Sequence, residues 1–145
     1  MKARPRPHRW LRPVVAALVA VTLAAPAVVH AAPEADSAEA ERLMAAAETA
    51  LDEGRQREAG ELLARAHRSL PASLRVGAVG KSVVLHAADA YEAAWLASDD
   101  VADLDAAIAL LTEHNAAPDA RDETVQRELA RLQVLRARLV RAPPG

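Results

Sequence analysis

The chain of 145 residues has no cysteine, no phenylalanine and only three aromatic residues, Trp10, Tyr91 and Trp95. Without cysteine it cannot form a disulfide, a thiol nucleophile or a zinc site with cysteine ligands. Alanine is instead abundant, with 37 copies. Its small side chain can build a helical core but buries too little area per position for a β-sandwich or barrel. The composition therefore predicts one small all-α domain.

The first 13 residues contain five basic residues and no acid, and an uncharged apolar run follows from Val14 to Val29. This order is typical of a secretory signal peptide. Small residues near the end of the run predict cleavage after Ala31, so residues 1–31 are the expected signal peptide. The alternative is an uncleaved membrane anchor, although the run is broken by Pro26 and is shorter than the ~20 apolar residues of a membrane span. We expect a protein of the periplasm or the extracellular space.

The charge balance changes when residues 1–31 are removed. The remaining chain has 13 basic and 20 acidic residues, a net charge of −7. This charge disfavours nucleic acid as a partner, because phosphates require a basic face, and it disfavours an anionic membrane surface. It is compatible with basic protein partners. Arginine makes up 16 of the 18 basic residues of the whole chain, which is typical of a GC-rich bacterial genome.

Apolar residues recur at spacings of three and four along five segments that glycine, proline or capping residues separate, which predicts five helices. The helical domain is expected over 37–141, between a disordered linker (32–36) and a loose tail (142–145). Gly77 and Gly80 fall at the start of the third helix, where each is expected to weaken it by up to ~1 kcal/mol relative to alanine. The predicted helices cover residues 37–53, 56–70, from between 73 and 78 to about 98, 101 to between 114 and 118, and 120–141.

Seven residues follow the order large, small, turn, small, large, small and proline: Leu43, Ala47, Gly54, Ala59, Leu63, Ala66 and Pro71. With this order, the 34 residues 40–73 resemble one tetratricopeptide repeat, a hairpin of two antiparallel helices. Ala50 departs from the pattern, which usually has tyrosine there. Ala106, Leu110 and Pro118 set a degenerate second unit over 87–120, at an offset of 47 residues, and 120–141 becomes the capping helix. The alternative is an unrelated small bundle, because alanine and leucine stripes occur there too.

Tyr91 and Trp95 are four residues apart and share a helix face, offset from the small-residue stripe of the third helix. The resemblance implies a groove, lined by the first helix of each hairpin, that receives a peptide. It places Tyr91 and Trp95 in this groove, together with Glu41, Met44 and Glu48. Exposed aromatic residues are typical peptide anchors, but the two rings can also fill the core. The sequence thus predicts a non-enzymatic adaptor that binds a protein or peptide.

The last predicted helix supports an alternative function. Leu129, Leu132 and Leu135 form a narrow seam with arginines on both sides. Such a seam is typical of helix pairing. A homodimer through this helix would make the chain a self-associating structural protein of the cell envelope.

We expect no catalytic, cofactor or metal site. Gly80-Lys81-Ser82 matches only the end of a phosphate-binding loop, and the chain has no G-x-S-x-G nucleophile motif. The three histidines after residue 31 are His67, His86 and His114, and no two have the i, i+4 spacing of zinc ligands on one helix. They could form a metal site only if the fold brought two of them together beside a carboxylate.

Overall fold

The computed structural model describes residues 31–141, with side chains from residue 36, and all regular structure in this range is helical. The predicted all-α class is confirmed. The predicted signal peptide up to residue 30 and the tail over 142–145 lie outside the described residues. The elements in chain order are α2 (Ala31–Asp52), α3 (Gln56–Ser69), α4 (Ala72–Arg75), α5 (Ala78–Ser98), α6 (Val101–Ala116), the 3-10 turn η1 (Pro118–Ala120) and α7 (Glu123–Arg141).

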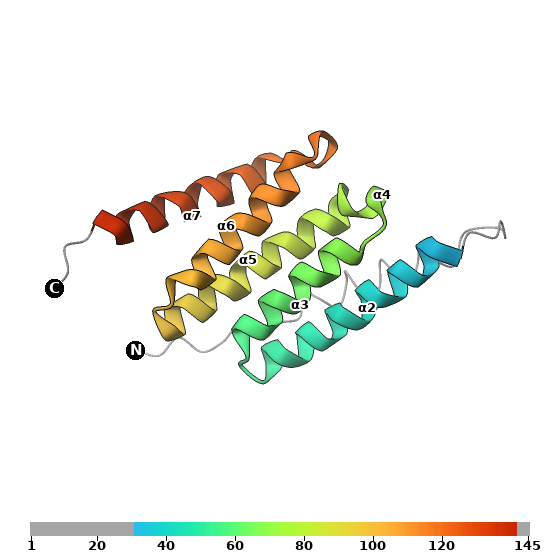
Figure 1. Ribbon diagram of the computed structural model, residues 1–145, viewed down its shortest axis with the longest axis horizontal. Helices are drawn as coiled ribbons and strands as arrows, with labels where there is room; N and C mark the ends of the chain where they lie inside the picture. The colour runs from blue at the N-terminus through green and yellow to red at the C-terminus, as the bar shows by residue number, and fades with distance from the viewer. Residues whose placement is uncertain (1–30, 142–145) are drawn as a thin grey trace.

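Figure 1 shows the five long helices side by side in chain order, from α2 through α3, α5 and α6 to α7. Helix α3 packs against both α2 and α5, and α6 packs against both α5 and α7. The arrangement therefore consists of two helix hairpins, α2 with α3 and α5 with α6, followed by the single helix α7.

The turns and caps follow the local sequence. Gly54 has a positive φ of 76°, which glycine adopts without strain, and it reverses the chain between α2 and α3. Asp99 ends α5 in the left-handed conformation, and the Asp100 carboxylate accepts a hydrogen bond of 3.1 Å from the Ala102 N–H at the start of α6. Asp100 is therefore the N-cap of α6.

Helix α2 begins earlier than the sequence pattern predicts. It starts at Ala31, so residues 32–36 form its first turns and the prediction of a disordered linker there is wrong. Pro33 is the third residue of the helix, where the N–H that proline lacks would have no partner within the helix. A proline this close to the start does not interrupt the helix.

The core consists mainly of interleaved alanine and leucine side chains, and it contains one aromatic ring. The Tyr91 ring lies directly over Gly60 of α3, where a Cβ atom would be only 2.9 Å from the ring. Tyr91 is 7% exposed as a result. The largest fully buried apolar side chains come from α2, α3, α5, α6 and α7: Met44, Leu63, Leu70, Val83, Val84, Leu104, Leu110, Leu111 and Leu132.

Helix α5 begins at Ala78, at the later limit of the predicted start, and the separate short helix α4 before it is not predicted. The backbone of Arg75 at the end of α4 passes over Gly80 of α5 so closely that a Cβ atom on Gly80 would be 2.8 Å from the Arg75 Cα, and closer still to its carbonyl group. Gly80 is therefore required by this close approach. Helix propensity, on which the sequence prediction for Gly80 rests, carries no information about this contact.

Candidate functional site

The structure separates the five residues of the predicted groove. Met44 is fully buried and Tyr91 nearly so, both within the core, so their assignment to an open groove is wrong. Met44 lies on the core side of α2, and Tyr91 fills the space that Gly60 leaves. Trp95 packs against the core with part of its side chain exposed, and Glu41 and Glu48 are half-buried.

Helix α5 presents a different row of residues to the surface. Leu85, Asp89, Glu92 and Leu96 follow one another at spacings of four, three and four, so they share one face, here called the α5 face. Leu96 is 67% exposed and Asp89 is exposed, whereas Leu85 and Glu92 are half-buried. Helices α3 and α6 pack on the buried residues of α5. The α5 face therefore combines apolar and acidic side chains.

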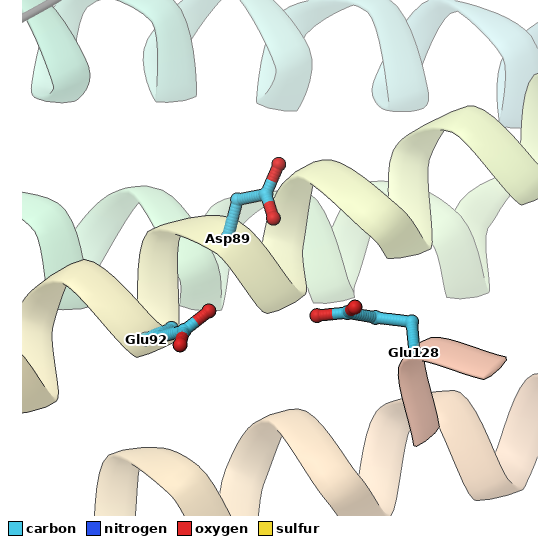
Figure 2. A group of neighbouring side chains, drawn as sticks. All are labelled: Asp89, Glu92 and Glu128. Atoms are coloured by element: carbon cyan, nitrogen blue, oxygen red, sulfur yellow. The ribbon is translucent and has the colours of Figure 1, made fainter. Parts of the chain in front are cut away.

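Three carboxylates meet at this face. Figure 2 shows Asp89 and Glu92 projecting from α5 and Glu128 reaching toward them from α7, and their oxygens lie within 4.8 Å of one another. Arg131 pairs with Glu92 at 2.5 Å and with Glu128 at 2.6 Å. Within residues 36–141, Asp89 forms no ion pair. Although Asp89 is exposed as a residue, partial desolvation of its carboxylate and then the neighbouring Glu128 and Glu92 carboxylates raise its pKa above the usual value. The cluster has three acidic groups and one arginine, so it favours a further cation.

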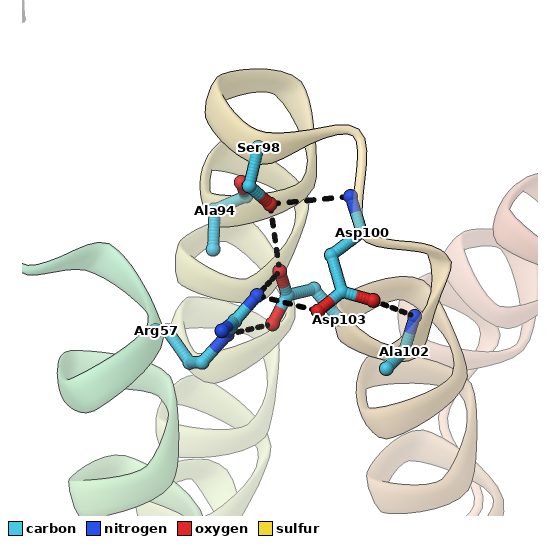
Figure 3. A network of polar contacts seen from close by, with 6 residues as sticks. All are labelled: Arg57, Ala94, Ser98, Asp100, Ala102 and Asp103. Carbon is cyan, nitrogen blue, oxygen red and sulfur yellow. Dashed lines mark hydrogen bonds and ion pairs between the residues drawn. The ribbon is translucent and has the colours of Figure 1, made fainter.

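A polar network joins α3 to α6 at the start of both helices (Figure 3). The Arg57 guanidinium donates to both carboxylate oxygens of Asp103, at 2.7 and 2.8 Å, and to Asp100 at 2.9 Å. Asp103 is only 3% exposed, and the Ser98 hydroxyl also donates to it at 3.4 Å. These hydrogen bonds raise the pKa of Arg57. Every charged group in this network has a partner, so its role is to hold the two hairpins together.

A second contact between α3 and α6 involves two buried histidines. His67 Nε2 lies 3.0 Å from His114 Nδ1, and the rings meet edge to face with centroids 5.1 Å apart. His67 is 1% exposed and His114 is 2% exposed. Burial lowers the pKa of His67 to about 4, with the neighbouring His114 as the next cause, and burial also lowers the pKa of His114. Both rings are therefore neutral at neutral pH.

The remaining nitrogens of this pair, His67 Nδ1 and His114 Nε2, are buried without a hydrogen-bond partner among the described residues. A cavity of about 110 Å³ adjoins both rings, and Glu113 also lines it. The sequence left open whether the fold brings two histidines together, and it does so for this pair. His67 and His114 are 47 residues apart, which is the offset between the two repeat units that the resemblance predicts, and this offset was the one available signal.

The leucine seam of the last helix is used inside the molecule. Leu132 is fully buried, and Leu129 and Leu135 pack against the core of the same chain. Leu132 is therefore part of the core, whereas Leu129 and Leu135 are half-buried. The exposed apolar residues of α7 are Val134 and Val140, which are 53% and 70% exposed.

The sequence matches no known family model and no curated protein, and the fold matches no solved structure. The fold defines an all-α class of stacked helix hairpins. None of the helices within residues 31–141 is long and apolar enough to cross a membrane.

Proposed function

We propose that the chain is an exported, non-enzymatic protein-binding module, built as a short tetratricopeptide-like stack. Its α5 face receives a basic amphipathic segment of a partner protein. The observation that carries the proposal is that the α5 face combines the exposed Leu96 side chain with a cluster of three carboxylates that has only one arginine. The proposed export rests on the basic and apolar order of the first 29 residues.

The chemistry of the α5 face favours a basic and partly apolar ligand. Leu85 and Leu96 lie at the two ends of the row and can contact apolar side chains, while Asp89 and Glu92 lie between them. Amphipathic helices bind through anchors at this kind of spacing. Lysine or arginine on the ligand would complement the carboxylates and increase the rate of association at low salt.

The experiment is site-specific photo-crosslinking in cells that express the protein. A crosslinking amino acid is placed at Leu96 on the α5 face or, as a matched control, at Val140, which is equally exposed but on α7. The proposal predicts a discrete crosslinked protein from position 96 only. Adding Asp89→Lys to the position 96 variant reverses one charge and is expected to abolish the crosslink.

The result can also refute the proposal. Equal crosslinking from both positions, or a position 96 product that Asp89→Lys leaves unchanged, would exclude the α5 face as the binding surface. Circular dichroism of each variant checks that the fold is retained. Tyr91→Ala is not a suitable test of binding, because Tyr91 is part of the core and its removal would lower stability.

A further inference from the structure

We propose that the chain binds further copies of itself head to tail, with the outer side of α7 in one copy packed on the outer side of α2 in the next. Helices α2 and α7 form the two ends of the row of helices in Figure 1. Helix α2 packs on α3 and α7 packs on α6, so each end helix has a side directed away from the rest of the chain. The proposal does not depend on the partner assigned to the α5 face.

The outer side of α7 combines an apolar residue with arginines. Four exposed residues at spacings of three, four and four define this surface, here called the α7 face: Arg127, Ala130, Val134 and Arg138. Val134 is 53% exposed. A groove of about 460 Å³ follows the α7 face and also includes the half-buried Leu135. An apolar side chain of a partner helix can therefore pack beside Val134.

The charge of the α7 face selects an acidic partner. Helix α7 contains five arginines and two glutamates. Arg138 forms no ion pair within residues 36–141, and Arg127 has only an exposed pair with Glu123, at 2.8 Å. Two α7 faces would repel each other, because arginines would oppose arginines. The charge therefore disfavours a symmetric pairing of α7 with α7 and favours a different, acidic surface.

The outer side of α2 provides such a surface. Its exposed residues recur at spacings of four, three, four and three and are here called the α2 face: Ala38, Arg42, Ala45, Thr49 and Asp52. Residues 36–52 contain five acidic residues and one basic residue. The single basic residue, Arg42, is paired with Glu39 at 2.6 Å. Glu41 and Glu48 border the α2 face, because each follows one of its alanines by three residues. The α2 face is therefore acidic and carries small side chains.

The two faces also match in length and shape. At a rise of 1.5 Å per residue, the 22 residues of α2 span about 33 Å and the 19 residues of α7 span about 29 Å. The small side chain of Ala45 lets a second helix approach closely, so that Val134 can contact α2. Such a contact repeats the packing of one helix on another that already joins α6 to α7.

Because the two faces differ, the contact leaves a free face at each end of a pair. A copy that binds through its α7 face keeps its α2 face for another copy. Stacks of helix hairpins extend in the same way, since each unit contacts only its neighbours. We therefore expect a series of dimers, trimers and longer assemblies.

The test is thiol crosslinking in cells that express the full chain. The sequence has no cysteine, so an introduced cysteine is the only thiol. Ala45→Cys and Val134→Cys, in chains with different affinity tags, are expressed together and treated with a membrane-permeable bismaleimide. We expect a product that carries both tags, and no product when either variant is expressed alone. Leu96→Cys replaces Val134→Cys in the matched control, because Leu96 is exposed but lies on α5.

Charge reversal tests the electrostatic part of the proposal. Arg127→Glu together with Arg138→Glu, in the Val134→Cys chain, is expected to reduce the mixed product by ~10-fold. The matched change of both arginines to lysine keeps the charge and is expected to retain most of the product. These positions are exposed, and circular dichroism checks that the helices are retained. A chain that carries both cysteines is expected to give trimers and longer products as well as dimers.

Four outcomes would overturn the proposal. They are the absence of the mixed product, an equal product from Val134→Cys alone or from the Leu96→Cys control, a mixed product that charge reversal leaves unchanged, and products of the double-cysteine chain that stop at the dimer. The photo-crosslink at position 96, which tests the α5 face, can be present or absent in each of these cases, so the two proposals fail separately.

Discussion

Replacing Gly80 with alanine is expected to lower the free energy of unfolding by about 2 kcal/mol, although alanine is the better helix former. Helix propensity alone predicts a gain of up to ~1 kcal/mol, although Gly80 is in the first turn of α5. The new Cβ atom would however lie 2.8 Å from the Arg75 Cα and closer still to the Arg75 carbonyl group, which is backbone and cannot rotate away. Overpacking of this kind usually costs about 1–3 kcal/mol. The new Cβ atom can be accommodated only if α4 moves away from α5, so we expect a cost at the upper end of this range.

The assay is thermal and urea unfolding followed by circular dichroism. A loss of 2 kcal/mol corresponds to a decrease in Tm of roughly 10 °C for a domain of this size. Gly77→Ala is the matched control, because a Cβ atom there would be 3.3 Å from the nearest atom, the Ser73 carbonyl oxygen, and φ is −92°. We expect Gly77→Ala to change stability by less than ~1 kcal/mol. If Gly80→Ala is neutral or stabilising, the close approach of α4 to α5 is wrong.

Three further predictions concern the joint between α3 and α6 and the last helix. The pKa of His67 is about 4 in the folded chain and 6.5 ordinarily, so the unfolded chain binds a proton first as the pH falls. The contribution of His67 is therefore complete above about pH 6.5 and decreases toward pH 4 by up to ~3 kcal/mol, which urea unfolding at several pH values will measure. His67→Gln is expected to reduce this pH dependence but not to abolish it, because burial also lowers the pKa of His86 to about 4. Arg57→Ala leaves the buried Asp103 carboxylate without its main partner and is expected to cost ~2–3 kcal/mol, whereas Arg127→Ala, in an exposed pair, must stay within ~0.5 kcal/mol. Leu132→Asp places a charge in the core and is expected to unfold the chain. If light scattering instead shows that the change releases a folded monomer from a dimer, the internal position of Leu132 is contradicted.

The helices and their ends could be predicted from the sequence because they depend on local signals. Gly54 at a positive φ and Asp100 at a helix start act on the residues next to them, so the C-terminal end of α2 and the start of α6 agree with the pattern to within one residue. The start of α2 was missed, because the polar composition of residues 32–36 was interpreted as disorder although the helix continues through them.

The candidate sites could not be predicted in the same way, because they depend on contacts between helices. Whether Tyr91 is a surface anchor or a core residue is decided by Gly60, on another helix, which leaves room for the ring. Similarly, Gly80 has its role through the backbone of Arg75, and periodicity carries no information about this contact. Which face of α5 is exposed can be derived only when the positions of α3 and α6 are known.

The contacts between α3 and α6 give the best physical support for a repeat. Arg57 with Asp103, His67 with His114 and Arg68 with Glu113 are separated by 46, 47 and 45 residues, which are all close to the 47-residue offset of the two predicted units. Equivalent positions of two stacked hairpins are expected to lie side by side, because neighbouring units of a repeat have the same geometry. Since α3 and α6 belong to different hairpins, these three contacts add polar links between the hairpins to the packing of α3 against α5. A change at the histidine pair therefore acts on the joint between the hairpins, whereas Asp89→Lys acts on the α5 face.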